Sequence, residues 1–295
     1  MKNLLAFKKH ALLLATLTVT ITTALSSQAV FANQTLNIGY QKASGLLSII
    51  KSQGVLEEAF ADQDIEINWR EFAAGPQLLE ALNAGSVDLG YTGSPPPIFA
   101  QSAGIELRYV AATQSLPNGE AIVVPEDSSI QTVEDLAGKR IGVQRGSSAN
   151  YLLVAALDAA GLEFSDVTAA YLTPADARGA FVNNNIDAWS VWDPYLTSAE
   201  FDLNARVLVD YANLNQAFGF YQASASFVEE NPELLQQLLD ALQEGSTWIS
   251  ENHDETVALL AQELGLSSEI VDAWQAKTDY TLLPLNNEVI ANRSE

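Results

Sequence analysis

The chain has 295 residues, with 14 Lys and Arg against 37 Asp and Glu and a formal net charge of −23. This acidity argues against nucleic acid or an anionic lipid surface as a partner, since both need clustered basic side chains. The sequence contains no cysteine and only two histidines, which excludes disulfides, thiolate metal sites, a cysteine nucleophile and a histidine-rich metal site. We therefore expect no metal and no cofactor.

Residues 1–32 have the pattern of a secretory signal peptide. Three lysines precede the apolar, Thr-rich run 11–25, and Val30-Phe31-Ala32 places small residues before a cleavage point at Asn33. A membrane anchor is the alternative, but the run is shorter than the ~20 residues of a spanning helix. We expect cleavage and export to the periplasm. Because three lysines and no acid leave, the formal charge of the exported chain becomes −26.

The remaining chain alternates short β-like runs with helical ones, which is typical of α/β layers with largely parallel sheets. Strands are predicted at 36–40, 65–69, 87–90, 121–124, 140–143 and 188–191, and helices at 77–83 and 151–160. From about Asn231 onward the pattern is mostly helical.

The sequence also nearly repeats itself. IGYQKAS at 38–44 matches IGVQRGS at 141–147, and the run at 83–88 matches the run at 183–187 in the same order. Two matches at nearly one offset favour two related α/β lobes over coincidence. We predict a first lobe at 33–114, a second lobe at 115–214 and a return to the first lobe at 215–295. Such a pair has a ligand cleft between the lobes and a hinge of two crossings.

Several loops follow strands at the sheet edge where ligands bind in open α/β folds. Gly93-Ser94 and Gly146-Ser147-Ser148 are the strongest candidates for an anion site. A Ser beside Gly at a helix start leaves backbone N–H groups free for an anion. Ordinary helix capping, worth ~1 kcal/mol, is the alternative. Neither loop matches the G-x-x-x-x-G-K-[ST] phosphate loop, so nucleotide binding has no support.

Trp192 and Asp193 occupy the places of Gly93 and Ser94 in the second repeat. Trp192 offers an apolar wall for an alkyl or aromatic tail. Asp193 either hydrogen-bonds the ligand or a nearby donor, or caps the helix that follows Pro194, and both interpretations stay open. Three other residues are interpreted as structural or solvated, namely Trp189 as core and Lys42 and Arg145 as charges at the rim.

Long motifs in the chain resemble one family. They are GYQK at 39–42, FAAGPQLLEALN at 72–83, VDLG at 87–90, GSS at 146–148, YLTPADAR at 171–178 and DAWSVWDPY at 187–195. These motifs resemble the periplasmic aliphatic-sulfonate-binding proteins of ABC importers, relatives of the taurine and nitrate binders. The resemblance implies a two-lobe periplasmic-binding-protein fold of type II. It also implies a monomer that captures an alkanesulfonate for sulfur acquisition and delivers it to an ABC permease in the inner membrane.

The resemblance further implies where the ligand lies. The sulfonate head group is expected between the two Ser-containing helix starts, with Trp192 on the tail side. The implied ligand-binding residues are Gln41, Gly93, Ser94, Thr113, Gln114, Gly146, Ser147, Ser148, Trp192 and Asp193. Family members usually continue past residues 286–289 with another helix and a short tail. An end at Glu295 therefore predicts a shortened C-terminus, natural or truncated, with weaker packing on the first lobe.

Other ligands and one enzymatic function stay open. Taurine, nitrate or a thiamine-precursor pyrimidine could occupy the same fold, and Tyr40, Trp192 and Tyr195 would supply stacking for the pyrimidine. The WDPY run at 192–195 leans toward general alkanesulfonates over taurine.

A secreted hydrolase would need paired carboxylates such as Asp88 and Asp193. Asp88 and Asp187 precede a strand in the same place of each repeat, which favours a structural role for both. His253, in a polar stretch, is interpreted as a solvated surface residue. We expect no enzyme activity.

Overall fold

The computed structural model describes residues 34–42, 44–114, 116–213 and 218–285. The predicted signal peptide and the predicted C-terminal shortening lie outside the described residues. The architecture below belongs to one unit, Asn33–Glu295. Within the described ranges, the model contains no helix with the length and apolarity to cross a membrane.

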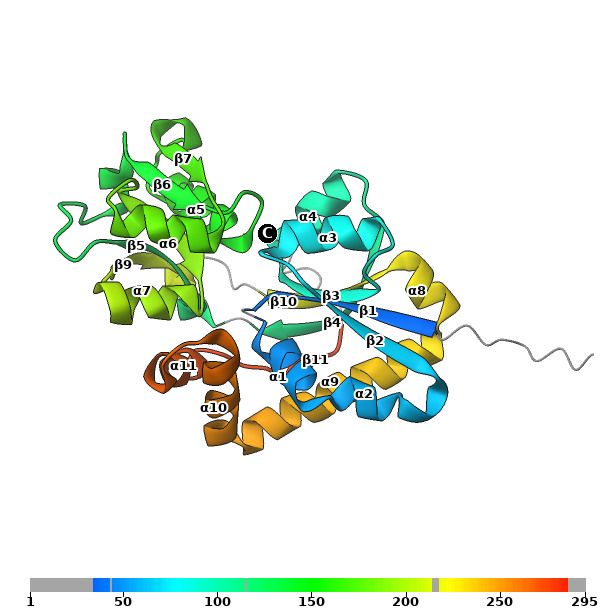
Figure 1. The fold of residues 1–295 in the computed structure, drawn as a ribbon. Coiled ribbons are helices and arrows are strands. Elements are labelled where there is room, and N and C mark those ends of the chain that lie inside the picture. Colours follow the sequence, from blue (N-terminus) through cyan, green and yellow to red (C-terminus); the bar gives the residue numbers. More distant parts are fainter. Residues whose placement is uncertain (1–33, 43, 115, 214–217, 286–295) are drawn as a thin grey trace, which may run out of the picture. The chain divides into compact units, whose positions relative to one another are not determined.

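The first sheet has six strands in the order β11-β4-β10-β3-β1-β2 (Figure 1). The strand β1 pairs in parallel with β2 and β3, whereas β10 pairs antiparallel with β3 and β4. All seven residues of β10 are buried, so this strand lies in the middle of the sheet and its core. The strands are β1 (Gln34–Tyr40), β2 (Ile65–Glu71), β3 (Leu89–Gly93), β4 (Leu107–Gln114), β10 (Phe218–Ser224) and β11 (Leu282–Leu283).

The second sheet has five strands in the order β7-β6-β8-β5-β9. Here β6 pairs in parallel with β7 and β8, and β5 pairs antiparallel with β8 and β9. Each sheet therefore has three parallel strands followed by an antiparallel one. The strands are β5 (Glu120–Val124), β6 (Arg140–Val143), β7 (Thr168–Tyr171), β8 (Ala188–Trp192) and β9 (Arg206–Asp210).

The helices follow the same division along the chain. Between strands of the first sheet lie α1 (Gly45–Gln53), α2 (Val55–Ala59), α3 (Gly75–Asn83), α4 (Pro95–Ser102), α8 (Ala225–Glu230), α9 (Pro232–Glu251), α10 (His253–Leu264) and α11 (Ser268–Gln275). Between strands of the second lie α5 (Ser148–Ala159), α6 (Pro174–Val182) and α7 (Tyr195–Leu203). Short 3₁₀ helices occur at Ala61–Gln63, Pro117–Gly119, Val133–Leu136, Phe164–Asp166 and Tyr211–Asn213.

All six predicted strands and both predicted helices are present, but the expectation of largely parallel sheets is wrong. The sheets are mixed because β5 and β10 each follow a passage of the chain from one sheet to the other. A strand that enters a sheet this way has no crossover helix to set it parallel to its neighbour. The strands β4, β7, β9, β10 and β11 were not predicted.

The internal repeat is visible in the packing. A Cβ atom placed on Gly39 would lie 3.0 Å from Val87 Cγ1, and one on Gly142 would lie 2.5 Å from Ile186 Cδ1. Val87 and Ile186 are matched residues of the two copies. A side chain at this point of either copy would press on the matched residue, so glycine suits the place where the first strand passes the residue before the third strand.

Asp88 and Asp187 have one structural role, as the sequence indicates. Asp88 Oδ2 accepts the backbone N–H of Asn37 at 2.7 Å, and the Asp88 N–H donates to the Asn37 carbonyl at 2.8 Å. Asp187 Oδ2 accepts the backbone N–H of Arg140 at 2.7 Å, and its own N–H donates to the Arg140 carbonyl at 2.7 Å. Each carboxylate ties the third strand of its copy to the first.

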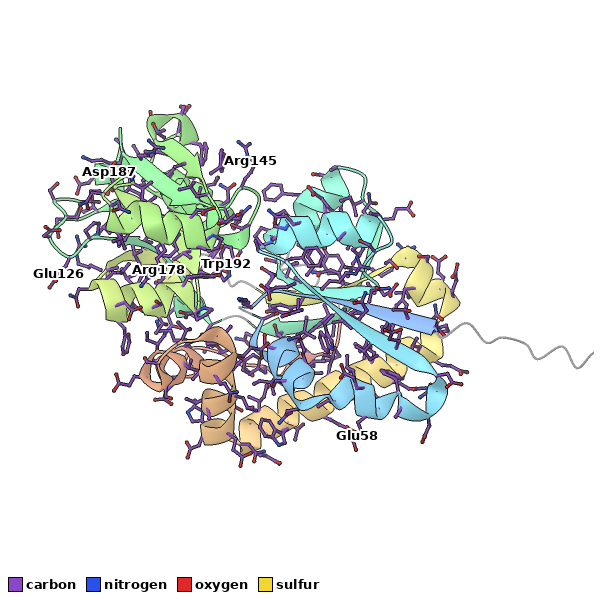
Figure 2. All side chains as sticks on the ribbon, in the orientation of Figure 1. Glu58, Glu126, Arg145, Arg178, Asp187 and Trp192 are labelled. Atoms are coloured by element: carbon purple, nitrogen blue, oxygen red, sulfur yellow. The ribbon has the colours of Figure 1, made fainter. Side chains whose placement is uncertain are left out.

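The formal negative charge lies mostly on the outside. Acidic side chains such as Glu58, Glu126 and Asp187 are exposed (Figure 2). Among the described residues, Asp193 is the one charged residue in the fully buried class, with 7% of its surface exposed.

We expect Asp88→Ala to lower the free energy of unfolding by about 1–3 kcal/mol, because it leaves the Asn37 N–H without its charged acceptor. Asp187→Ala should do the same in the second copy, by less because Asp187 is more exposed. Urea unfolding followed by circular dichroism measures both. Asp158→Ala, an exposed substitution on α5, is the control and should change stability by less than about 0.5 kcal/mol. Equal free energies of unfolding for all three variants would contradict a stabilising role of these carboxylate hydrogen bonds.

Candidate ligand-binding cleft

The starts of α4 and α5 approach each other closely. The strand β3 ends at Gly93 just before α4, and α5 begins at Ser148. A Cβ atom on Gly93 would lie 3.2 Å from Ser148 Cβ and 3.4 Å from Ser148 Oγ. A larger residue at 93 would press on Ser148, so glycine suits the close approach of the two helix starts.

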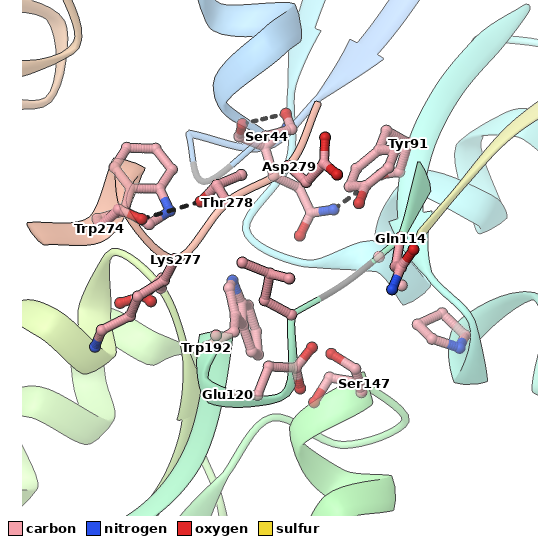
Figure 3. Close-up of a pocket in the computed structure, with 18 residues that line it drawn as sticks. Ser44, Tyr91, Gln114, Glu120, Ser147, Trp192, Trp274, Lys277, Thr278 and Asp279 are labelled. Atoms are coloured by element: carbon pink, nitrogen blue, oxygen red, sulfur yellow. Dashed lines mark hydrogen bonds between the residues drawn. The ribbon is translucent and has the colours of Figure 1, made fainter. Parts of the chain in front are cut away.

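A cleft of roughly 140 Å³ opens at this approach (Figure 3). Its wall is formed by residues near strand ends of both sheets and by residues 274–279, at the end of α11 and just after it. The cleft brings together seven of the ten sequence-predicted site residues, namely Gln41, Gly93, Gln114, Ser147, Ser148, Trp192 and Asp193. A space of this size suits a small ligand better than a nucleotide or peptide.

Three predicted site residues do not line this cleft. Thr113 Oγ1 hydrogen-bonds Tyr91 Oη at 3.1 Å and lines a smaller neighbouring cavity of about 60 Å³. The Gly146 N–H, expected to be free for an anion, donates to Asn150 Oδ1 at 3.0 Å. Ser94 flanks α4, but its side chain makes no capping hydrogen bond. Local hydrogen bonding thus withdraws Thr113 and Gly146 from the ligand space.

Helix capping accounts for the side chain of Ser147. Its Oγ accepts the Asn150 N–H at 3.2 Å and donates to the Gln144 carbonyl at 2.8 Å. The next residue, Ser148, begins the first turn of α5, where backbone N–H groups have no acceptor within the helix. The positive end of the α5 dipole therefore meets the cleft at Ser148, which makes this helix start the better of the two for an anion.

Gln41 is held in place from two sides. Its Nε2 donates to the Tyr91 carbonyl at 3.0 Å, and its backbone carbonyl accepts Ser44 Oγ at 2.6 Å. The matched pair in the second copy, Gln144 and Ser147, forms the same side-chain to backbone bond. The amide of Gln41 has further donor and acceptor capacity for a ligand.

Two tryptophans line the cleft. Trp192 is half-buried and packs edge to face on Tyr195, with ring centroids 6.4 Å apart. Trp274, from α11, is 3% exposed. Of the three aromatics named for a stacked pyrimidine, only Trp192 lines the cleft. Tyr40 instead packs against Trp69, at 5.9 Å.

Asp193 caps a helix with one carboxylate oxygen and leaves the other without a partner. Its Oδ1 accepts the Thr197 N–H at 2.8 Å and Thr197 Oγ1 at 2.6 Å. Its Oδ2 is enclosed and has no hydrogen-bond partner among the described residues. Burial raises the pKa of Asp193 to about 6, although the positive charge of Lys277 lowers it. The capping interpretation is therefore correct for Oδ1, whereas Oδ2 is enclosed and unpaired beside the cleft.

Lys277 is the one cationic side chain among the described lining residues, but it is already engaged. Its Nζ donates to Glu200 Oε2 at 2.8 Å and to Thr197 Oγ1 at 3.2 Å. These bonds join the segment after α11 to α7. Most of the positive charge of Lys277 is thus balanced by Glu200, and a ligand in the cleft meets chiefly neutral donors.

Sequence reasoning missed Glu120, the first residue of β5. The residue as a whole is half-buried, but Oε2 of its carboxyl is enclosed and has no hydrogen-bond partner in the described structure. The pKa of Glu120 is raised to about 7, chiefly by burial; the hydrogen bond with the Ser148 side chain lowers this pKa, and the negative charge of Asp193 contributes to the rise. The sequence offered one signal for this residue: it is an acid directly before the apolar run 121–124, where the chain passes from one sheet to the other.

The cleft residues 274–279 were also missed. No motif marks Trp274, Lys277, Thr278 and Asp279, because they reach the cleft only through the packing of α11. Among the described residues, no cluster of three or more His, Asp or Glu side chains could hold a metal ion.

The residues interpreted as structural or solvated lie as predicted. Trp189 is 1% exposed in the core. Arg145 lies 3.7 Å above the Tyr171 ring, and Lys42 lies 3.7 Å from Glu71. His253 is on the surface beside Asp272, at 2.7 Å.

Comparison with known proteins identifies close relatives. The NMT1/THI5 like family model matches residues 59–256. An aliphatic sulfonates-binding protein of Escherichia coli (strain K12) is 44% identical over 259 residues, which are 88% of this chain and 81% of the relative. Among solved structures, the alkanesulfonate-binding protein SsuA from Xanthomonas axonopodis pv. citri bound to MOPS is 39% identical, with a TM-score of 0.83 over 88% of this chain and 89% of that chain.

The periplasmic aliphatic sulphonate binding protein SsuA from Escherichia coli is 43% identical, with a TM-score of 0.78 over 88% of this chain and 89% of that chain. The predicted periplasmic-binding-protein fold is therefore confirmed.

Replacing Glu120 by Gln should stabilise the protein at high pH and not at low pH. The fold raises the pKa of Glu120 from 4.5 to about 7, so it favours the neutral carboxyl. Wild type therefore loses stability as the pH rises from about 4.5 through about 7, and Gln does not. We expect a difference of about 1–3 kcal/mol at about pH 8.5, and little at about pH 4.5.

Urea unfolding at the two pH values measures this difference. Glu126→Gln, on an exposed residue just after β5, is the control and should show no pH-dependent difference. A Glu120→Gln effect of the same size at both pH values would contradict the buried, raised-pKa carboxyl.

Proposed function

Because this chain belongs to the NMT1/THI5-like family and, within it, to the aliphatic-sulfonate-binding proteins, we propose that it captures an alkanesulfonate and delivers it to an ABC permease for sulfur acquisition. The observation that carries the proposal is the approach of α4 to α5 at Gly93 and Ser148. This approach gives a small cleft with a helix N-terminus at its wall, which suits a compact monoanion.

The two parts of the cleft suit the two parts of an alkanesulfonate. Its head group has three acceptor oxygens and would lie at the start of α5 beside Ser147 and Ser148, with the Gln41 amide in reach. Its alkyl tail would lie against Trp192 and Trp274. Nitrate has no tail to use this apolar wall, and a pyrimidine would find one of its three expected stacking partners there.

The lobes, the compartment and the oligomeric state belong to the same proposal. Residues 33–114 and 215–295 would form one lobe around the first sheet, and 115–214 the other around the second. The signal pattern at 1–32 supports export to the periplasm, where a monomer would meet the permease. The E. coli relative of solved structure is itself described as periplasmic.

We infer that the protein performs no chemistry on its ligand. The relatives are named as binding proteins. In the described structure, Asp88 is committed to Asn37 at the start of β3, whereas Asp193 lines the cleft that follows the far end of that strand. The proposed acid–base pair is therefore not brought together. No histidine is among the lining residues described, so a Ser–His arrangement has no base there.

A ligand screen by thermal denaturation tests the function. We expect short 1-alkanesulfonates to raise Tm, because ligand binding stabilises the native state by about 2.7 kcal/mol at a hundredfold excess over Kd. For a chain of this size, that corresponds to roughly 5–10 °C. Sulfate, nitrate and a pyrimidine should give smaller shifts. Isothermal titration of 1-butanesulfonate then gives Kd. A folded protein that binds no sulfonate, or binds nitrate or the pyrimidine more tightly, would contradict the proposal.

Trp192→Ala should weaken binding more for longer tails. A methylene group against an apolar wall contributes about 0.8 kcal/mol, and the variant loses this contribution for each methylene that contacts Trp192. We expect a loss of about tenfold for 1-butanesulfonate, and a smaller loss for methanesulfonate. Isothermal titration with both ligands measures the ratio. Trp69→Ala, at a tryptophan that does not line the cleft, is the control. Equal losses for both ligands in Trp192→Ala would place the tail elsewhere.

A further inference from the structure

The carboxyl of Glu120 lies at the part of the cleft where the proposed function places the ligand's head group. Glu120 lines the cleft together with Ser147 and Ser148, and Figure 3 shows its carboxyl directed toward the Ser147 region at the start of α5. Ser148 in turn lies against Gly93, where a Cβ atom would be 3.2 Å from Ser148 Cβ. An acidic side chain thus stands beside the helix N-terminus that suits an anion.

The Glu120 carboxyl has one oxygen with nothing to bind. Oε2 is enclosed and lacks a hydrogen-bond partner among the described residues. An unpaired, enclosed polar atom is costly in a folded protein unless a ligand or water completes it. Because Glu120 lines the cleft, a ligand bound there can supply the partner that this carboxyl lacks.

The charges around Glu120 come from several elements. Asp193, before α7, adds negative charge, while the hydroxyls of Tyr91 on β3 and Tyr211 after β9 are neutral neighbours. Asp279, which also lines the cleft, is acidic too. Lys277 donates to Glu200, and its positive charge lowers the pKa of Asp193. No described cation therefore pairs with Glu120. An ionised Glu120 would face both Asp193 and the incoming anion in a place of low dielectric.

We propose that Glu120 is a ligand-binding residue that holds the sulfonate as a neutral carboxylic acid, so that ligand uptake carries one proton into the cleft. The proton comes from the solvent, and the O–H of Glu120 donates to a sulfonate oxygen. This proposal rests on the proposed function. It deepens that function by giving the cleft a donor that suits a head group composed of acceptors only.

The pH dependence follows from the raised pKa of the free protein, about 7. A bound anion raises the pKa of Glu120 further, because it disfavours the ionised form. Affinity should be flat below about pH 6.5 and should fall above about pH 7.5, by up to tenfold per pH unit. The uptake should approach one proton per ligand at about pH 8.

Isothermal titration of wild type with 1-butanesulfonate tests this, because its head group stays anionic throughout the pH range used. Titrations at about pH 8 in buffers of different ionisation enthalpy give the number of protons taken up. We expect the apparent enthalpy to change with the buffer at about pH 8, and not at about pH 5.5. This measurement needs no variant.

Three variants assign the proton. Glu120→Gln cannot ionise, so above about pH 7, where Asp193 is already mostly ionised, its Kd should be independent of pH and its binding enthalpy independent of buffer. Asp193→Asn tests the neighbouring carboxyl and should keep most of the pH dependence. Glu126→Gln, exposed just after β5, should behave as wild type.

The outcomes separate this inference from the proposed function. Binding of 1-butanesulfonate by wild type with a flat pH profile and no proton uptake would overturn the inference alone. A pH dependence that survives in Glu120→Gln and disappears in Asp193→Asn would also overturn it, since the proton would then belong to Asp193. Absence of binding at every pH would overturn the proposed function and the inference with it.

Discussion

The contact between Gly93 and Ser148 is the constraint on which the cleft depends. Gly93 ends β3 of the first sheet and Ser148 begins α5 beside the second sheet, and a Cβ atom on Gly93 would lie 3.2 Å from Ser148 Cβ, which is tighter than most such contacts. The approach brings the start of α4 against the start of α5 and leaves a cleft of roughly 140 Å³. The Lys277 bonds to Glu200 and Thr197 reinforce it from the other side, because they join the segment after α11 to α7. Closure around a ligand would act on both contacts.

The repeat explains why two such loops exist at all. Matched residues make matched bonds in the two copies, as with Asp88 and Asp187, or the Ser44 and Ser147 hydroxyls on the carbonyls of Gln41 and Gln144. The copies then diverge where they face the cleft. Gly93 in one copy corresponds to Trp192 in the other, so close approach is needed on one side and an apolar wall stands on the other. The two copies thus share the same supporting hydrogen bonds but place different residues at the cleft, so its two sides differ.

The local fold could be predicted from the sequence, whereas most of the cleft lining could not. Alternating apolar runs locate β1, β2, β3, β5, β6 and β8, because period and turn residues are local signals. The strand β10 was not predicted, because its place between β3 and β4 comes from pairing with strands that are distant in the sequence. Gln41, Gly93 and Ser148 follow predicted strands and were found for that reason. Lys277 and Asp279 reach the cleft only through tertiary packing, which no motif records.

Gly146 and Thr113 show a different limit. Each has the residue type and position of a ligand contact, and each is committed to a neighbour, Asn150 or Tyr91. Sequence pattern identifies which groups can bind an anion, but only the hydrogen bonds of the folded chain show which groups are already used. Glu120 is the reverse case, an acid that no anion-site pattern would include and whose Oε2 is nevertheless left unpaired in the cleft wall.

The net charge of the chain has a bearing on these assignments. A chain with a formal net charge of −23 gives no long-range attraction to a sulfonate. Affinity must then arise within the cleft, from donors that act at hydrogen-bond distance. The N–H groups at the start of α5, the Gln41 amide and a protonated Glu120 are all neutral. Neutral donors attract no carboxylate as a counter-charge, so they stay free for the ligand, whereas the one cationic lining side chain described, Lys277, is already paired with Glu200.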